Sequence, residues 1–278
     1  NQLKMKTTVR LLVLMLAICV STNFYSQEEA KESSQQEFKP VYITMTTTHW
    51  NDDPETDFSG WLDTEREYFE KVIKKNDLVM SSGVYTHYFT PDNSEIVMVN
   101  VYKNWADIEK AEEINQKLIE EAWPEEKDRQ AFFEKQRGYY KPDHKDEIYL
   151  SMPFMIPEAD NGGESRIYYI RSSELAMNGN GKPEKFKEHF EKVTKKSKRL
   201  KGYYTHRHLW GSNSREMAEV FVFDKLGDIE DFFDEEQEIV NSTWADEEER
   251  NTFFKDLNSN FTGKHADYVY RSVPELQK

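Results

Sequence analysis

The sequence predicts an α+β protein in which one strand–helix–strand–strand–helix–strand unit occurs twice. Three observations support this: a long internal repeat, the same order of strand-like and helix-like periods in both copies, and 37% hydrophobic residues for a core. Residues 69–75, Phe-Glu-Lys-Val-Ile-Lys-Lys, return as Phe-Glu-Lys-Val-Thr-Lys-Lys at 190–196, a spacing of 121 residues that also relates Trp123 to Trp244. Because such a repeat marks duplicated structural units, we expect two copies of one fold.

The elements of the first copy follow from its periodicity. Residues 41–48 are rich in β-branched side chains and predict a strand. Apolar residues from Trp61 to Ile73 then recur at helical spacing. The remaining elements expected, in order, are strands at 84–89 and 96–102 joined by a Pro-Asp-Asn turn, a helix from 108 to 122, a fresh helix after Pro124, and a strand at 148–152. The second copy repeats this order from Ile167 to Tyr270.

Composition also predicts how the chain is divided. A stretch with two prolines and an Asn-Gly-Gly sequence separates the copies and predicts a linker. The predicted divisions are a signal peptide at 1–27, a flexible tether at 28–38, a first unit at 39–152, the linker at 153–164, a second unit at 165–273 and a tail at 274–278.

A unit with this element order is ferredoxin-like, with a four-stranded antiparallel sheet covered on one face by two helices. The element order and the duplication resemble the dimeric α+β barrel superfamily, in which two such sheets meet face to face. This resemblance implies two tandem ferredoxin-like units that form an α+β barrel within one chain. Members of the superfamily include cofactor-independent monooxygenases, haem-dependent chlorite dismutases and lactone isomerases. None of their catalytic motifs is matched here, so the resemblance implies a fold and no particular activity.

The first 27 residues have the layout of a secretory signal. Lys6 and Arg10 precede an apolar run at 11–20, and small polar residues follow. A run of about 10 residues is too short for a bilayer, which needs about 20. We therefore expect an exported protein, periplasmic or extracellular, without stable membrane insertion once the signal is removed. A lipid anchor on Cys19, the only cysteine, is the alternative, although the bulky Ile18 precedes it.

The charge of the chain argues against one class of partner. Lysine and arginine number 37 against 52 aspartates and glutamates, which gives a net charge of −15. Such a chain repels phosphate backbones, so we expect no nucleic acid as a partner. No dinucleotide, Walker or zinc-protease motif occurs, so the sequence predicts no metal site and no cofactor, with haem kept open by the resemblance.

Candidate site residues come from a Tyr-x-His sequence found in both copies, Tyr85 with His87 and Tyr204 with His206. Alternation puts each pair on one face of its strand. If Val97, Val99 and Val101 face the helices, their neighbours point into the barrel. This reasoning predicts a pseudo-symmetric cavity lined by Tyr85, His87, Asn100, Tyr204, His206 and Glu219. His87 and His206 are the catalytic candidates, as general bases. The alternative is that these histidines fill the barrel centre in satisfied hydrogen bonds.

The predicted function is the binding of a small aromatic or haem-like molecule between the two sheets. The first alternative is a cofactor-independent monooxygenase or isomerase that uses a barrel histidine. The second is an interaction module whose acidic helical faces, such as 230–238, meet a basic partner. The sequence does not indicate an oligomeric state.

Overall fold

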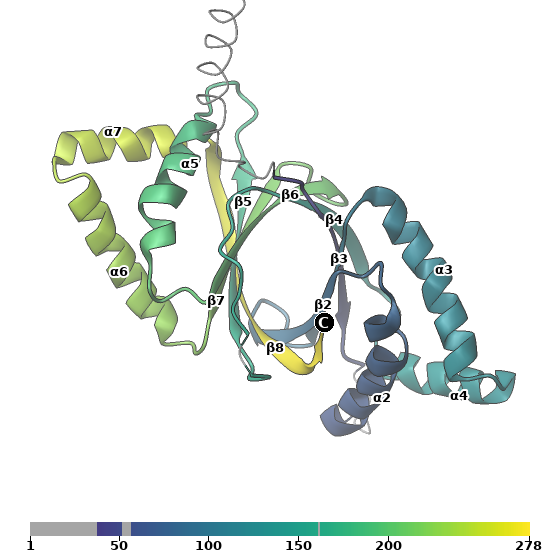
Figure 1. Cartoon of the computed structure of the whole chain (residues 1–278). Coiled ribbons are helices and arrows are strands. Elements are labelled where there is room, and N and C mark those ends of the chain that lie inside the picture. The colour runs from purple at the N-terminus through teal and green to yellow at the C-terminus, as the bar shows by residue number, and fades with distance from the viewer. Residues whose placement is uncertain (1–37, 52–56, 161) are drawn as a thin grey trace, which may run out of the picture. The chain divides into compact units, whose positions relative to one another are not determined.

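Eight antiparallel strands close into a barrel in the computed structural model, which describes residues 38–51, 57–160 and 162–278 (Figure 1). Around the barrel the strands follow the order β1-β3-β2-β8-β5-β7-β6-β4. Their bounds are β1 Tyr42–His49, β2 Ser81–Phe89, β3 Glu95–Tyr102, β4 Lys145–Ser151, β5 Ile167–Leu175, β6 Gly202–Trp210, β7 Glu216–Phe223 and β8 Phe261–Gln277. The predicted signal peptide, Cys19 and residues 28–37 of the predicted tether lie outside the described residues. The predicted α+β class is confirmed.

The helices lie outside the barrel in two groups (Figure 1). The first group is α2 Phe58–Lys71, α3 Trp105–Ala122 and α4 Glu126–Arg137. The second is α5 Pro183–Lys192, α6 Asp228–Thr243 and α7 Glu247–Asn258. Short 3-10 turns at Ile73–Lys75 and Thr194–Lys196 follow α2 and α5. Within the described ranges, no helix is long and apolar enough to cross a membrane.

The same strand order occurs in both parts of the barrel. We call residues 40–152 the first half and residues 165–278 the second half. The first half supplies β4-β1-β3-β2 and the second supplies β8-β5-β7-β6, and the barrel closes where β2 meets β8 and β4 meets β6. The repeated tryptophans have matching surroundings, because Trp123 stacks on Phe132 at 4.1 Å and Trp244 on Phe253 at 3.9 Å.

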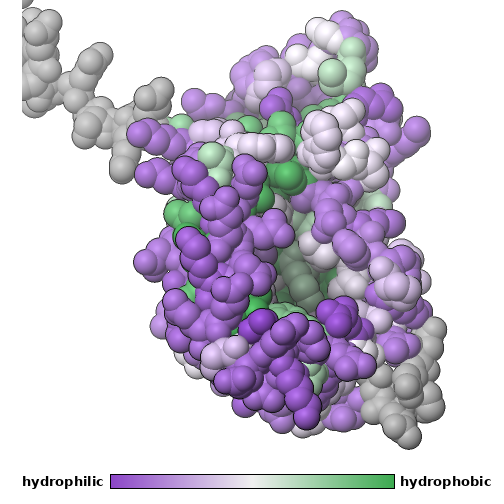
Figure 2. Space-filling view, turned by 90° about the vertical axis from the view of Figure 1, so that its right-hand side faces the viewer, coloured by the Kyte–Doolittle hydropathy of each residue, from purple (hydrophilic) through white to green (hydrophobic). Residues whose placement is uncertain are grey.

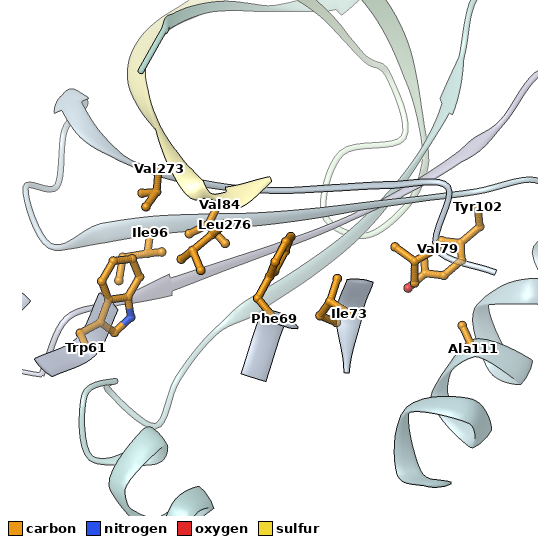
Figure 3. Close-up of a cluster of buried hydrophobic side chains, with 10 residues drawn as sticks. All are labelled: Trp61, Phe69, Ile73, Val79, Val84, Ile96, Tyr102, Ala111, Val273 and Leu276. Atoms are coloured by element: carbon orange, nitrogen blue, oxygen red, sulfur yellow. The ribbon is translucent and has the colours of Figure 1, made fainter. Parts of the chain in front are cut away.

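Apolar side chains fill the space between each sheet and its helices. The cluster of the first half is drawn in Figure 3, and its members are Trp61, Phe69, Ile73, Val79, Val84, Ile96, Tyr102, Ala111, Val273 and Leu276. The corresponding cluster of the second half is Ile167, Tyr169, Phe190, Leu200, Tyr203, Phe221, Phe223 and Phe232. On the side seen in Figure 2 the surface is mostly hydrophilic, and hydrophobic residues lie in a hollow between hydrophilic ridges.

The face predicted for the β3 side chains is wrong by one residue. Val97 and Val99 pack inside the barrel with Tyr168, Val222 and Tyr270. Ile96, Met98 and Tyr102 instead join the cluster under the helices of the first half. Both faces of this strand are buried and apolar, so the alternation that would distinguish them is missing from its sequence.

Two segments that were expected to be loose are built into the barrel. The predicted tail, 274–278, continues β8 to Gln277, and Leu276 is fully buried. Lys278 exchanges backbone hydrogen bonds of 2.8 and 3.2 Å with Ser82 of β2. In the predicted linker, Ile156 forms a bridge with Tyr203 of β6.

Candidate functional site

Three of the predicted site residues lie together inside the barrel. The Tyr85 ring lies 4.6 Å from that of Tyr168, and the rings of Tyr204 and His206 stack at 6.4 Å. Burial lowers the pKa of His206 to about 4, so this imidazole is neutral at physiological pH. Its Nδ1 is buried and has no hydrogen-bond partner among the described residues. His87 pairs with Tyr270 across the strands, and its Nδ1 lies 2.8 Å from Thr90 Oγ1.

The two Tyr-x-His sequences do not occupy equivalent places. Tyr85 lies opposite Val97 in the first half, whereas in the second half His206 lies opposite Ala218, the residue 121 positions after Val97. The similar sequences are therefore offset by two residues along their strands. An offset of two keeps both pairs on the inner face but removes the predicted pseudo-symmetry.

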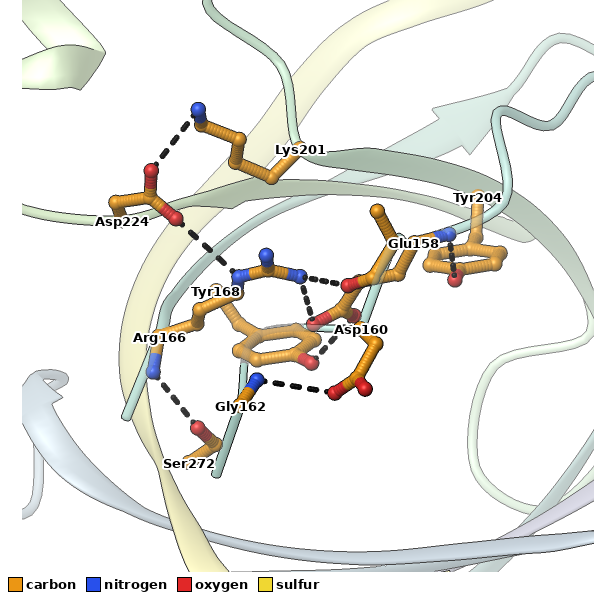
Figure 4. Close-up of polar contacts among 10 residues, drawn as sticks. Glu158, Asp160, Gly162, Arg166, Tyr168, Lys201, Tyr204, Asp224 and Ser272 are labelled. Carbon is orange, nitrogen blue, oxygen red and sulfur yellow. Dashed lines mark hydrogen bonds and ion pairs between the residues drawn. The ribbon is translucent and has the colours of Figure 1, made fainter. Parts of the chain in front are cut away.

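A residue of the linker takes part in the polar network of the barrel (Figure 4). The carboxylate of Glu158 accepts hydrogen bonds from Arg166 Nη1 at 2.6 Å and from the Tyr168 hydroxyl at 2.7 Å. The backbone N–H of Glu158 donates to the Tyr204 hydroxyl at 2.9 Å. Arg166, whose side chain is only 6% exposed, also contacts Asp224 at 3.3 Å. Most of the polar groups of these barrel residues are therefore already bonded to other residues of the chain.

Asn100 and Glu219 lie on the opposite face from the one predicted. Asn100 alternates with Val99 and Val101, which pack inside the barrel, so its side chain lies on the helix side of the sheet. Glu219 likewise lies beside residues of the helix-side cluster in the second half. Neither Asn100 nor Glu219 therefore lines the barrel interior as predicted.

Glu219 belongs to a group of ionisable residues that the strand register brings together. Arg171 of β5 lies directly opposite Glu219 of β7. On the other side, Tyr203 of β6 donates its hydroxyl to Glu219 Oε1 at 2.6 Å. Arg171 Nη2 donates to the Tyr169 hydroxyl at 2.8 Å, and Arg171 Nε lies 3.4 Å from Asp267. A buried carboxyl and a guanidinium thus share one face of the second sheet.

Two helices add Glu236 and His189 to this group. Glu236 lies on α6 and His189 lies on α5. Glu236 Oε1 is 4.0 Å from His189 Nε2, and the side chains are 26% exposed for Glu236 and 18% exposed for His189. We call Arg171, His189, Tyr203, Glu219 and Glu236 the acid–histidine cluster. Its partial exposure leaves it accessible to solvent although protein surrounds it on most sides.

Burial and neighbouring charges raise the pKa values of the two glutamates in this cluster and lower the pKa of its histidine. Burial raises the pKa of Glu219, against the opposing effects of the Tyr203 hydrogen bond and Arg171. Burial, and then repulsion from Glu219, raises the pKa of Glu236 to about 7. Burial lowers the pKa of His189 to about 4. At pH 7 His189 is therefore neutral and forms no ion pair with Glu236, which is itself about half protonated.

The first half has no equivalent of this cluster. The residues 121 positions before Tyr203, Glu219 and Glu236 are Ser82, Met98 and Asn115. Tyr68 stands in the place of His189, and the strand register gives Thr46 in the place of Arg171. This combination of ionisable residues is therefore found in the second half and not at the matching described positions of the first half.

Sequence reasoning missed four members of the acid–histidine cluster. The repeat gives no reason to single out His189, because Tyr68 occupies the matching position, and Arg171, Tyr203 and Glu236 belong to no recognisable motif. A signal was nevertheless present: these are positions at which the two copies differ in charge or polarity. A His-x-Asp sequence also occurs in each half, but both pairs are local and exposed: His144 lies 3.1 Å from Asp146, and His265 lies 3.3 Å from Asp267.

Neither the acid–histidine cluster nor the barrel interior around His206 is well suited to a haem. Haem needs an axial ligand such as a neutral histidine, and its two carboxylates need cationic partners. His189 is neutral, but the carboxyl of Glu236 lies beside it and would disfavour the carboxylates of a haem. In the barrel, His206 is neutral and buried, and the Arg166 guanidinium is already paired with Glu158 and Asp224. The described ranges also contain no cluster of three or more acidic, histidine or cysteine side chains that could hold a metal ion.

No protein-family model matches the chain, and no curated protein matches its sequence. Solved structures do resemble it. A "putative monooxygenase" from Fusobacterium nucleatum is 9% identical, with a TM-score of 0.50 over 86% of this chain and 94% of that chain. A mutant chlorite dismutase from Candidatus Nitrospira defluvii is 11% identical, with a TM-score of 0.50 over 85% of this chain and 93% of that chain. At such low identity the likeness shows the fold alone, that of α+β barrel proteins.

Proposed function

We propose that the second half binds a small organic molecule at the acid–histidine cluster and exchanges a proton with it through Glu236. The observation that carries this proposal is the meeting of Glu236, Glu219 and neutral His189 on one partly exposed face. A general acid or base works best with a pKa near the working pH, and the pKa of Glu236 is about 7. Glu219, held by Tyr203, keeps the pKa of Glu236 raised.

The surroundings suggest the class of molecule. One aromatic ring beside the cluster is accessible, since Phe233 is 36% exposed, lies 6.0 Å from the buried ring of Tyr169 and has the Arg171 guanidinium 5.9 Å above it. An aryl ketone with a proton on the carbon next to its carbonyl fits these contacts. The Glu236 carboxylate would take that proton, and the electron pair of the C–H bond would move to the carbonyl oxygen to form an enolate. The Arg171 guanidinium would stabilise the negative charge on this oxygen.

Deuterium exchange tests the proposal directly. We would incubate a panel of aryl ketones with the protein in D2O and follow loss of the proton signal beside the carbonyl by NMR. We expect exchange that increases as the pH rises through about 7, and that falls roughly 100-fold in Glu236→Gln. Glu238→Gln, an exposed carboxyl on the same helix, is the matched control. Equal exchange rates in the wild type and Glu236→Gln would rule the proposal out.

A second binding place is the barrel interior, where Tyr85, Tyr204 and His206 lie. The buried Nδ1 of His206 favours a molecule that donates a hydrogen bond to it. Titration of such a donor, phenol, against the wild type and His206→Ala tests this idea. Loss of binding in the variant supports it, and unchanged binding contradicts it.

We also propose an origin and a destination for the chain. The matching strand orders of the two halves support a tandem duplication of one ferredoxin-like unit. The layout of residues 1–27 supports export. Recovery of the mature protein from the periplasm or medium, with a new N-terminus between Ser21 and Glu28, tests the second point.

A further inference from the structure

The first half contains a cavity away from the acid–histidine cluster. Its volume is about 350 Å³, and it is lined by Trp50, Asn51, Phe58 and Thr86. These residues come from the end of β1, the start of α2 and the middle of β2. The volume is at the small end of the range found for ligand sites, which suits a molecule of one or two rings.

The aromatic wall of this cavity is held in place from behind. Trp61 is fully buried, and its ring lies 4.8 Å from Trp50 and 5.2 Å from Phe58. Its indole Nε1 donates to the Tyr140 hydroxyl at 2.7 Å, and that hydroxyl donates to Glu65 at 2.8 Å. Trp61 therefore cannot turn without breaking a buried hydrogen-bond chain.

The front of the wall is accessible. Phe58 is 53% exposed although it is a large apolar side chain at the start of a helix. The helix start itself is fixed, because the Asp57 carboxylate accepts a hydrogen bond of 2.7 Å from Gly60 N–H. An aromatic side chain held on a fixed helix end and left exposed loses little entropy when a ring stacks on it.

Among the described residues, the polar groups that line the cavity are the Asn51 amide and the Thr86 hydroxyl, and both are uncharged. Asn51 uses its Nδ2 to donate to Gly138 O at 3.0 Å, which leaves the amide oxygen as an acceptor for a ligand. The Thr86 hydroxyl is the other polar group in the lining. A sugar would bring a hydroxyl on nearly every carbon, and most of these would lack a partner here. We propose that this cavity binds a planar, uncharged aromatic molecule, with its ring against Trp50 and Phe58.

The experiment uses 2-naphthol as the probe and the full chain as the protein. Ring–ring contacts are worth roughly 1 kcal/mol beyond their area, so Phe58→Ala should weaken binding roughly tenfold or more, as measured by isothermal titration. Phe58→Tyr keeps the ring and should retain the affinity. Phe89→Ala is the matched control, because Phe89 is 58% exposed and its ring contacts Tyr88 rather than the cavity.

Three results would overturn the proposal: no binding of 2-naphthol to the wild type, equal weakening by Phe58→Ala and Phe89→Ala, or equally tight binding of glucose. Thr86→Val changes a second lining residue without loss of bulk, and it should weaken the hydrogen-bonding naphthol more than naphthalene. Glu236→Gln should leave the affinity for 2-naphthol unchanged, so this proposal and the one for the second half succeed or fail separately.

Discussion

Replacing Glu236 by glutamine should stabilise the protein at alkaline pH. In the folded protein the pKa of Glu236 rises from 4.5 to about 7, because burial and Glu219 disfavour its charge. A carboxyl with a raised pKa contributes stability below pH 4.5, and that contribution is lost as the pH rises through about 7. At pH 8 the ionised carboxylate therefore costs about 3 kcal/mol. Glutamine carries no charge, and the first half already has an amide, Asn115, at the matching position.

The assay is thermal and urea unfolding of the wild type, Glu236→Gln and Glu238→Gln between pH 5 and pH 8.5. For a chain of this size 1 kcal/mol changes Tm by roughly 2–4 °C, so the Glu236→Gln variant should melt several degrees above the wild type at pH 8. The two should converge as the pH falls toward 4.5. The exposed Glu238→Gln should follow the wild type throughout. A constant difference between Glu236→Gln and the wild type across this pH range would refute the reasoning.

Three further substitutions probe other parts of the fold by urea denaturation. Glu158→Ala leaves the buried Arg166 without its shortest partner and should cost about 3–5 kcal/mol; a loss below 1 kcal/mol would mean that the remaining contacts suffice. Phe232→Ala removes a ring that is 1% exposed, and the resulting cavity should cost about 3–5 kcal/mol. Leu276→Ala should cost about 2–5 kcal/mol, while the exposed neighbour Glu275→Ala should be nearly neutral; equal effects would show that the end of β8 is not part of the core.

The order of strands and helices was predictable because the two copies support each other. A weak strand signal near residue 97 gains weight from a similar signal 121 residues later. The tryptophans at 123 and 244 mark the same corner of each half, and in the structure both stack on a phenylalanine of the next helix. The end of β8 was missed, because Pro274 and the polar residues around it are typical of a tail.

The directions of the side chains were less predictable. Ile96, Val97, Met98 and Val99 are all apolar, since β3 is covered by helices on one face and by the opposite sheet on the other. Only Asn100 interrupts the run, and a polar residue was assumed to face a cavity. It lies instead under the helices, with its Oδ1 buried and unpartnered among the described residues.

The acid–histidine cluster depends on tertiary structure more than on any motif. His189 and Glu236 come from two helices that are separated in the chain by a 3-10 turn and two strands, and neither has a sequence signature of its own. Their meeting depends on how α5 and α6 pack on the sheet. In a duplicated chain, such sites can be searched for at the positions where the two copies differ in charge.

The way β8 completes the first half has a consequence for synthesis on the ribosome. Val273 and Leu276 belong to the apolar cluster under α2, so the first half lacks part of its own core until the second has been made. At 5–20 residues per second this interval is on the order of 10 s. Throughout that time the nascent first half presents β2 as an unpaired edge, which is open to pairing with other chains. We therefore expect the first half to reach its final packing only after residue 276 has been synthesised.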